Sequence, residues 1–292
     1  MKNCAKCKFS FVSSHWNCPD CGYVPPSVNG FLALAPELAE EGAGFRPEAF
    51  EQLASLEARN FWFGARNRLI IWMLQKYFPT MQRYMEIGCG TGYVLTGVAQ
   101  AFPKTKLVGS EVFSVGLPYA ASRVGTAELL QMDARQIPFT DEFDAIGAFD
   151  VLEHIVEDEA VLAAMLKALR PGGGVAITVP QHPWLWSTTD ESACHVRRYR
   201  AGELREKAVR AGFAVVFETS FVSLLLPAML ASRLVMRRSR EQVEAMPEMR
   251  LPPWLNRTFE FVMNTERHLI QRGLRFGMGG SRLLIARKKE TA

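Results

Sequence analysis

The sequence, 292 residues long, lacks an apolar run that could span a membrane. Its longest apolar stretch, residues 221–236, is interrupted by Pro227 and Arg233 and falls short of the roughly 20 residues that a spanning helix needs. The first residues are polar and contain several lysines, without the apolar centre of a secretory leader. We therefore expect a cytoplasmic protein.

Strong net charge is also missing. The formal net charge is +4, and 48% hydrophobic with 22% charged residues is an ordinary globular composition. This composition excludes an intrinsically disordered chain, and the charge alone does not indicate a nucleic-acid partner. The charge is uneven, because residues 221–292 carry 13 Lys and Arg against 6 Asp and Glu.

Cysteine is scarce, with six in the chain, yet four of them lie in the first 21 residues. Cys4 and Cys7 form one C-x-x-C knuckle, and Cys18 and Cys21 form a second. Two such pairs of thiolates can hold one tetrahedral Zn²⁺, and a cytoplasmic setting favours metal over disulfides. The spacing predicts a structural zinc ribbon over residues 1–26, with no open coordination position for catalysis. A redox dithiol pair is the alternative.

Residues 27–292 follow a linker marked by Pro25-Pro26 and are expected to form one α/β domain. Strand-like and helical segments alternate, which is typical of a mostly parallel sheet with helices on both faces. Helices are expected over residues 47–59, 61–78, 93–102, 114–124, 157–169 and 203–211. Seven strands are expected, over residues 84–87, 106–110, 129–132, 143–149, 175–179, 213–219 and 281–287.

A helical insert of residues 221–277 is expected before the last strand, with helices over 222–240 and 254–275. Its first helix mixes apolar residues with four arginines: Arg233, Arg237, Arg238 and Arg240. This mixture favours an interfacial helix that touches a membrane through residues 221–240, or a lid over an apolar substrate. The alternative is a helix that only packs on the core.

A glycine-rich loop follows the first strand of the α/β domain. Gly88, Gly90 and Gly92 would let the backbone turn sharply and approach a ligand. Glu111 ends the next strand, where a carboxylate can accept both hydroxyls of a ribose. The G-x-G-x-G spacing differs from the dinucleotide fingerprint, and Glu86 would repel a pyrophosphate. We therefore predict a nucleotide-like cofactor with a cationic end, which disfavours a nicotinamide oxidoreductase.

With these motifs the chain resembles the class I S-adenosylmethionine-dependent methyltransferases. Further matches are Gln131-Met-Asp-Ala134, Phe149-Asp-Val-Leu-Glu-His154 and Leu169-Arg-Pro-Gly-Gly-Gly174. The resemblance implies a Rossmann-like fold and S-adenosylmethionine as cofactor, with Glu111 on the ribose and Asp133 on the adenine amine. The cofactor-binding residues that it implies are Glu86, Gly88, Gly90, Gly92, Glu111, Asp133, Ala134 and Phe149.

Asp150, Glu153 and His154 form a compact cluster after the strand at 143–149. The cluster is similar to the E-x-x-E-H cluster of the ubiquinone-pathway O-methyltransferases, with Asp150 in place of the first glutamate. The resemblance implies a divalent cation, Mg²⁺ or another, that would orient a phenol and lower its pKa. The alternative is that Glu153 makes a structural contact and His154 touches the cofactor or a helix.

Three histidines are candidate general bases, because neutral imidazole is poised near pH 7. His154 follows the fourth strand, and His182 and His195 follow the fifth, where acceptors usually dock. Trp184 and Trp186 could line an apolar acceptor, or they could be packing aromatics with His182 and His195 in capping roles.

The sequence as a whole predicts a methyltransferase for a small, aromatic or lipid-like acceptor, with O-methylation favoured. The alternatives are an RNA or ribosome-component methyltransferase docked by the ribbon, and a binding module without turnover. Residues 1–60 contain 5 Lys and Arg against 7 Asp and Glu, so no nucleic acid is expected. Arg66, in the helix at 61–78, is expected to be a solvated surface charge. The sequence leaves the oligomeric state open.

Overall fold

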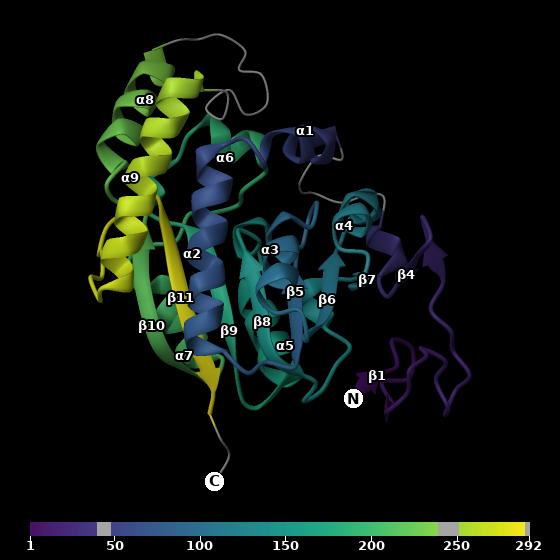
Figure 1. The fold of residues 1–292 in the computed structure, drawn as a ribbon. Helices are drawn as coiled ribbons and strands as arrows, with labels where there is room; N and C mark the ends of the chain where they lie inside the picture. The colour runs from purple at the N-terminus through teal and green to yellow at the C-terminus, as the bar shows by residue number, and fades with distance from the viewer. Residues whose placement is uncertain (40–47, 239–250, 290–292) are drawn as a thin grey trace.

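The computed structural model describes residues 1–39, 48–238 and 251–289, and a nine-stranded sheet forms the centre of this part of the chain (Figure 1). Its strands are β3 (Ser27–Val28), β4 (Phe31–Ala33), β5 (Arg83–Ile87), β6 (Lys106–Glu111), β7 (Glu128–Gln131), β8 (Phe143–Phe149), β9 (Leu169–Pro180), β10 (Phe213–Phe221) and β11 (Ser281–Lys288). A separate small sheet pairs β1 (Lys2–Asn3) with β2 (Ser10–Phe11).

Helices connect these strands and cover both faces of the main sheet. They are α1 (Glu48–Leu56), α2 (Phe61–Tyr77), α3 (Tyr93–Ala101), α4 (Leu117–Arg123), α5 (Asp158–Ala168), α6 (Thr188–Ser192), α7 (Glu203–Arg210), α8 (Leu226–Arg238) and α9 (Pro253–Gln271). Short 3-10 turns lie at Pro36–Leu38, Ser114–Gly116, Ala134–Gln136, Leu152–His154 and Pro183–Leu185.

The strand order is β10-β11-β9-β8-β5-β6-β7-β4-β3. The strands from β9 to β4 run parallel, whereas β11 runs antiparallel to both of its neighbours. From the central β5 the chain first builds outward through β6 and β7, and then returns to add β8 and β9 on the other side. This reversal leaves a crevice at the carboxyl ends of the strands, which is where ligands bind in such sheets.

The expected Rossmann-like α/β fold is confirmed, and all seven expected strands are present as β5 to β11. The sheet is wider than expected because β3 and β4 extend it beside β7. The side chain of Gln131 fixes this edge, since its amide accepts from the Ala35 backbone nitrogen at 3.1 Å and donates to the Ala35 carbonyl at 2.8 Å. Residues directly after the Pro25-Pro26 linker therefore belong to the main sheet.

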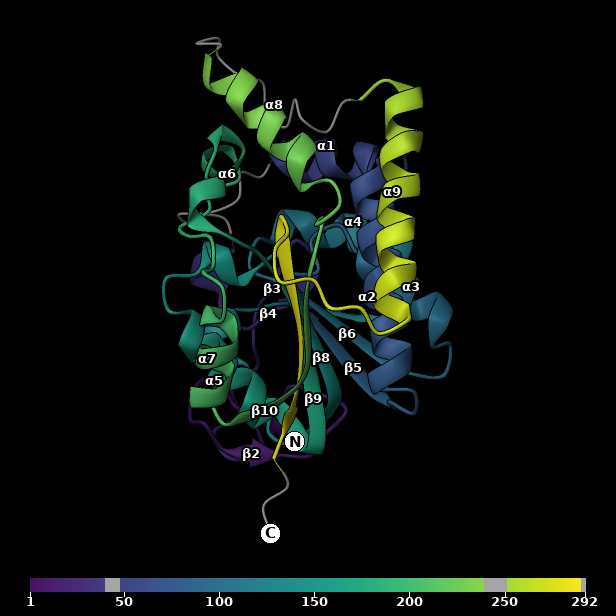
Figure 2. The same ribbon diagram turned by 90° about the vertical axis from the view of Figure 1, so that its left-hand side faces the viewer.

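Two apolar cores lie on the two faces of the sheet. In Figure 2, α2, α3 and α9 cover one face, and α5 and α7 cover the other. Helix α2 buries Leu69, Ile70, Met73 and Leu74 at helical spacing, as the sequence pattern predicts. On the opposite face α5 buries Val161, Leu162 and Met165.

Helices α8 and α9 form the expected helical insert between β10 and β11. The side chains of Arg237 and Arg238, and all of Arg240, lie outside the part of the chain that the structure describes. None of the helices within the described ranges combines the length and the apolar character that a membrane crossing requires.

Candidate functional site

The glycine loop leaves the end of β5 in a conformation that favours glycine. Gly88, Gly90 and Gly92 have φ angles of 61°, 53° and 78°. A β-carbon at Gly92 would lie 2.8 Å from the Ala120 backbone, and one at Gly88 would lie 2.5 Å from the Val151 side chain. At Gly88 and Gly92 the loop therefore packs against its neighbours at distances that leave no room for a side chain, whereas a β-carbon at Gly90 would meet no described atom within 4 Å.

Two glutamates flank this loop, and both are buried. Glu111, at the end of β6, accepts hydrogen bonds from the backbone nitrogens of Gly90 at 3.0 Å and Val112 at 2.8 Å. Burial raises the pKa of Glu111 even though these bonds oppose the shift. Glu86 has one carboxylate oxygen without a hydrogen-bond partner among the described residues. Burial raises the pKa of Glu86 to about 8, although Arg66 acts in the opposite direction.

Asp133 follows β7 and caps the turn at Ala134–Gln136. Its carboxylate accepts from the Arg135 backbone nitrogen at 2.9 Å and pairs with the Arg135 guanidinium at 3.0 Å. Ala134 and Phe149 lie beside it in the wall of the same cavity. The fold thus brings together all of the predicted cofactor-binding residues: Gly92 shapes the turn, and the others line the cavity.

The cavity has a volume of about 1400 Å³ and lies at the carboxyl ends of the central parallel strands. It extends from the glycine loop to Glu153, His154 and His195. The insert contributes an apolar part of the wall, with Leu225 and Met229 before and within α8, and Leu255 and Phe259 on α9. The cavity is thus larger than the roughly 300–1,000 Å³ of a typical small-molecule pocket, and both ligands of a two-substrate reaction would fit in one continuous space.

Arg66 is buried, so the expectation of a solvated surface charge is wrong. Its guanidinium pairs with the Asp150 carboxylate at 2.6 Å and donates to the Phe149 carbonyl at 2.9 Å. The backbone of Asp150 has a φ of 58°, in a turn just after β8. This turn brings the carboxylate to Arg66 on α2, where the ion pair compensates the burial of both charges.

A second buried network fastens α1 over the glycine loop, and sequence reasoning missed it. Glu57 accepts hydrogen bonds from the Thr91 hydroxyl and from Arg123, each at 2.6 Å. Arg123 also donates to the Ala54 carbonyl at 3.1 Å. The residues come from the end of α1, the loop and α4, so no local sequence pattern connects them.

His195 is held by a buried carboxylate that the sequence did not single out in this role. Asp190, which is completely buried, accepts from His195 Nδ1 at 2.9 Å and from Arg198 Nε at 2.7 Å. Burial alone would raise the pKa of Asp190, but these partners hold it below its usual range. The bond at Nδ1 leaves Nε2 of His195 directed toward Glu153, with 3.9 Å between Nε2 and the nearer carboxylate oxygen.

Glu153, His154 and His195 bring ligand atoms within 4.8 Å of one another. The Glu153 carboxylate is fully buried, and neither oxygen has a hydrogen-bond partner within the described ranges. Burial, reinforced by Asp150, raises the pKa of Glu153, and burial together with His195 lowers the pKa of His154 to about 4. The residues that lie together thus differ from the predicted cation cluster. Asp150 forms an ion pair with Arg66, and His195 is the third residue beside Glu153 and His154.

His182 is not among the described residues that line the cavity. Its ring stacks on Trp184, with centroids 5.1 Å apart, and Trp184 is half exposed. The indole of Trp186 donates to Glu191 at 3.3 Å. The stretch from His182 to Trp186 therefore packs beside the site, and the predicted aromatic lining comes instead from Phe259 and other residues of the cavity wall.

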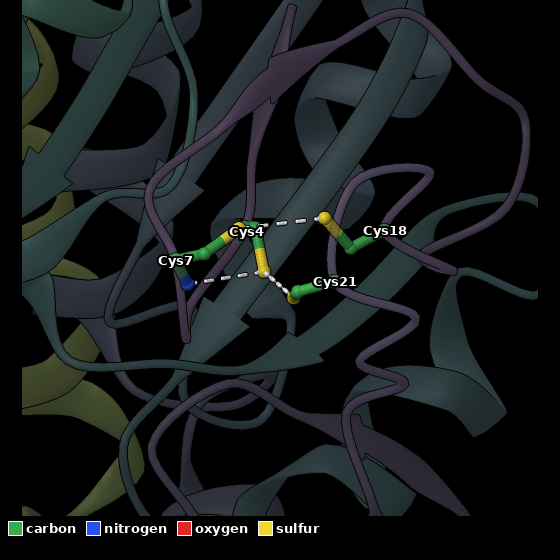
Figure 3. Close-up of side chains that lie close together, drawn as sticks. All are labelled: Cys4, Cys7, Cys18 and Cys21. Carbon is green, nitrogen blue, oxygen red and sulfur yellow. Dashed lines mark hydrogen bonds between the residues drawn. The ribbon is translucent and has the colours of Figure 1, made fainter.

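The four N-terminal cysteines converge from their two knuckles (Figure 3). The sulfurs of Cys4 and Cys21 are 3.7 Å apart, and those of Cys7 and Cys18 are 3.6 Å apart. A tetrahedral Zn²⁺ with bonds of about 2.3 Å separates its sulfurs by roughly 3.8 Å. No disulfide joins any cysteine that the structure describes. The donor set and its spacing therefore fit one zinc ion.

This cysteine-bearing segment packs far from the cavity. The Asn3 backbone nitrogen donates to the Pro138 carbonyl at 2.8 Å, and the rings of Trp16 and Phe139 meet edge to face at 5.4 Å. Residues 138 and 139 lie just before β8, whereas the candidate site lies just after β8. The two therefore occupy opposite ends of the sheet.

Comparison with known proteins agrees with this geometry. Residues 85–173 match a family model described as a methyltransferase domain. A probable S-adenosylmethionine-dependent methyltransferase of Mycolicibacterium smegmatis is 23% identical over 56% of this chain and 63% of its own length. A ubiquinone biosynthesis O-methyltransferase of Alkalilimnicola ehrlichii is 30% identical over 32% of this chain and 40% of its own length. The chain thus spans less than two thirds of either relative.

Among solved structures, the [4+2]-cyclase SpnF is similar in fold, with a TM-score of 0.54 and 21% identity over 79% of this chain and 84% of that one. At this identity the similarity concerns the fold alone. The segment that matches the family model begins in β5 and ends in β9, so it contains the glycine loop, Glu111 and Asp133. Residues 85–173 are therefore similar to a methyltransferase domain, and the fold agrees with this similarity.

Proposed function

We propose that the protein transfers a methyl group from S-adenosylmethionine to an oxygen of a small, aromatic or lipid-like acceptor. The observation that carries this proposal is one cavity that joins the glycine loop to His195 and is walled by apolar residues of α8 and α9. The name of the A. ehrlichii relative supports oxygen as the acceptor atom.

The cofactor would lie along the carboxyl ends of β5, β6 and β7. Glu111 would accept the ribose hydroxyls, and Asp133 the adenine amine, while Ala134 and Phe149 would pack beside them. Glu86 offers a buried carboxylate oxygen, without a described partner, to the ammonium group of the methionine end. When bound, the cofactor supplies a methyl group on a sulfonium, and the protein's task is to align the acceptor with it.

His195 would act as the general base. Asp190 accepts from Nδ1 and thereby keeps the proton on that nitrogen, so that Nε2 can take the proton of an acceptor hydroxyl. Asp190 and Arg198 are positioning residues in this scheme. The low pKa of His154 keeps its imidazole neutral at pH 7, so it too could accept a hydrogen bond from the acceptor. We give His182 no part, because it does not line the cavity.

The alternative to a general base is that Glu153, His154 and His195 together hold a metal ion. One carboxylate and two imidazoles suit a transition ion better than Mg²⁺, which prefers oxygen ligands. The ion would lower the pKa of an acceptor hydroxyl. Metal analysis separates the two uses: a second metal per chain that is lost in His195→Gln supports the ion, and a single zinc supports the base.

Isothermal titration with S-adenosylmethionine tests the core of the proposal. We expect binding by the wild-type protein and at least about tenfold weaker binding by Glu111→Ala, because two charge-assisted hydrogen bonds to the ribose are lost. Glu159→Ala, at an exposed ion pair with Arg210, is the matched control and should bind normally. Wild-type protein that binds no cofactor would refute the proposal. A comparison of metabolites from a deletion strain would then identify the acceptor.

We further propose that residues 1–26 form a zinc ribbon and residues 27–292 the methyltransferase domain. The main alternative function is methylation of RNA or a ribosomal component docked by the ribbon. Against it, the ribbon packs at the end of the sheet opposite the cavity. A salt-dependent gel shift with RNA would favour that alternative. Cofactor binding without any methyl transfer to cell extracts would favour a non-catalytic module.

A further inference from the structure

The outward face of α9 carries two large exposed aromatic side chains. Trp254 is 69% exposed and Phe261 is 73% exposed, and they lie two helical turns apart on the same face. The inward face of the helix buries Met263, Glu266 and Ile270. Figure 2 shows α9 along the right-hand edge of the molecule, in front of α2 and away from α8.

Basic residues share this outward face. The exposed residues of this face form a surface that we call the outward stripe. It consists of Trp254, Arg257, Thr258, Phe261, Thr265, His268 and Arg272. The hydroxyls of Thr258 and Thr265 donate to the carbonyls of Trp254 and Phe261 at 2.9 Å, so both hydroxyls are already satisfied within the helix.

Acidic residues are absent from the outward stripe as far as the structure describes the chain. The two glutamates of α9 are engaged elsewhere. Glu260 pairs with Arg68 of α2 at 2.8 Å. Glu266 is buried and accepts from the backbone nitrogens of Ser223 and Leu224, each at 2.7 Å. Within the described residues, the stripe thus combines exposed aromatic rings with Arg257 and Arg272, for which no ion pair with an acidic side chain is present.

We propose that the outward stripe docks on the surface of an anionic phospholipid bilayer. Tryptophan and phenylalanine bury their rings at the boundary between headgroups and acyl chains, and arginines pair with lipid phosphates. The partner should be negatively charged, because the stripe contains no acidic residue and basic residues are in excess over residues 221–292. The sequence predicts membrane contact through residues 221–240, which stays untested because the side chains of Arg237 and Arg238 and all of Arg240 lie outside the described residues. The proposal for α9 rests on a different segment.

The same helix connects this surface to the cavity. Leu255 and Phe259 on its inward side line the cavity, so a docked bilayer would lie about one helix diameter, roughly 10 Å, from the acceptor space. An acceptor with a lipid tail could then reach the cavity along α9. Docking itself does not depend on the proposed function, because vesicle binding is measured without cofactor or acceptor.

Flotation of the full chain with vesicles tests the proposal. Vesicles of phosphatidylcholine alone are compared with vesicles that also contain phosphatidylglycerol, at low and at high salt. We expect the protein to float with the anionic vesicles at low salt and to be released at high salt. Protein that does not float with anionic vesicles at low salt overturns the proposal.

Paired variants locate the contact. Each arginine near an anionic surface contributes roughly fivefold to binding, so Arg257→Glu/Arg272→Glu should weaken flotation at least about 25-fold. Trp254→Ala/Phe261→Ala should weaken it on neutral and anionic vesicles alike. Arg205→Glu/Arg210→Glu makes the same charge change on exposed side chains of α7 and should leave flotation within about twofold.

Two outcomes would overturn the assignment to lipid. An equal loss in the α7 control would mean that net charge, and not the stripe, governs flotation. A wild-type dimer that dissociates in Trp254→Ala/Phe261→Ala, without any vesicle binding, would assign the stripe to a second copy of the chain. Thermal melting of every variant, compared with wild type, verifies that the fold is retained.

Discussion

Glu86 is a buried carboxyl group in the proposed cofactor half of the site. In the ligand-free protein its raised pKa of about 8 keeps it protonated at neutral pH. A cationic ligand beside it would favour the carboxylate, so the binding of such a ligand would displace the proton. In the proposed role Glu86 would therefore couple cofactor affinity to pH.

We predict that S-adenosylmethionine binding releases a proton below pH 8 and tightens up to about tenfold per pH unit as pH rises toward 8. Isothermal titration in buffers of different ionisation enthalpy measures the released proton. Glu86→Gln should bind more weakly and release none. Proton release that persists in Glu86→Gln would contradict this role.

Glu86 should also affect the pH dependence of stability. Its folded pKa lies above the ordinary value of 4.5, so the protonated carboxyl stabilises the fold and this stability is lost as pH rises through about 8. Glu86→Gln should therefore melt at a higher temperature than wild type above pH 8, and the two should converge toward pH 4.5. Scanning calorimetry of the ligand-free proteins checks the sign.

Gly92 and Gly90 form a matched pair within one loop. Both have positive φ, but a β-carbon at Gly92 meets the Ala120 backbone at 2.8 Å, whereas one at Gly90 meets no described atom within 4 Å. Gly92→Ala should cost about 2–4 kcal/mol of unfolding free energy and Gly90→Ala about 1 kcal/mol. Urea denaturation measures both, and equal costs would show that crowding at Gly92 is relieved.

His195→Gln should lower methyl transfer about 10²–10⁴-fold without changing the dissociation constant of S-adenosylmethionine. His182→Gln is the comparison, because His182 was an equal candidate by sequence and does not line the cavity. It should retain most of the activity. Transfer of a labelled methyl group into small molecules of a cell extract is the readout, and the reverse ranking would exclude His195 as the base.

The sequence correctly placed residues whose position follows from one strand end. The glycine loop and Asp133 come just after a strand and Glu111 ends one, and parallel strands bring their carboxyl ends to one edge. The roles of these residues in cofactor binding stay predictions. Prediction from the sequence failed for Arg66, whose partner Asp150 is distant in sequence, and it missed the pair of Glu57 and Arg123. Such pairs form only through the tertiary fold, and no local pattern marks them.

At the scale of elements, the proposed zinc ribbon of residues 1–26 can be tested through its cysteines. Cys4→Ser/Cys18→Ser should lose zinc, loosen the packing of Trp16 on Phe139, and lower the melting temperature by several degrees. Cofactor affinity should change less than about twofold, because the ribbon packs at the opposite end of the sheet. Elemental analysis should give one zinc per wild-type chain.

Cys194→Ser is the control for this prediction, since Cys194 lies outside the ribbon and should retain zinc. A ribbon variant that keeps its zinc would disprove the assignment of the ligands. One that binds cofactor much more weakly would instead show that the two ends of the sheet are coupled.

The elements that sequence periodicity missed are the shortest ones. β3 and β4 contain two and three residues, and α6 contains five, too few to display a period. β3 and β4 form because the exposed edge of β7 offers backbone partners and Gln131 binds Ala35. Longer elements were predicted well, because their apolar residues recur with the period of a helix or a strand.

At the scale of the whole molecule, the cavity and the cysteine-bearing segment lie at opposite ends of one sheet. The carboxyl ends of its strands face the cavity, and the start of β8 carries the ribbon. The insert between β10 and β11 reaches over the same cavity and presents the outward stripe on its far side. The size of the cavity could not be predicted from sequence, because it depends on how far α8 and α9 stand from the sheet.

The place of β11 has a consequence for synthesis on the ribosome. β11 lies between β9 and β10 and pairs with both, yet residues 281–288 are made after all the other strands. A nascent chain that ends before residue 281 lacks the strand that joins β10 to β9, so β10 cannot yet join the sheet. The parallel strands from β4 to β9 can assemble first, and α9 can already pack on α2 through the ion pair of Glu260 with Arg68. Products that end before residue 281 would therefore leave the edges of β9 and β10 without their partner strand.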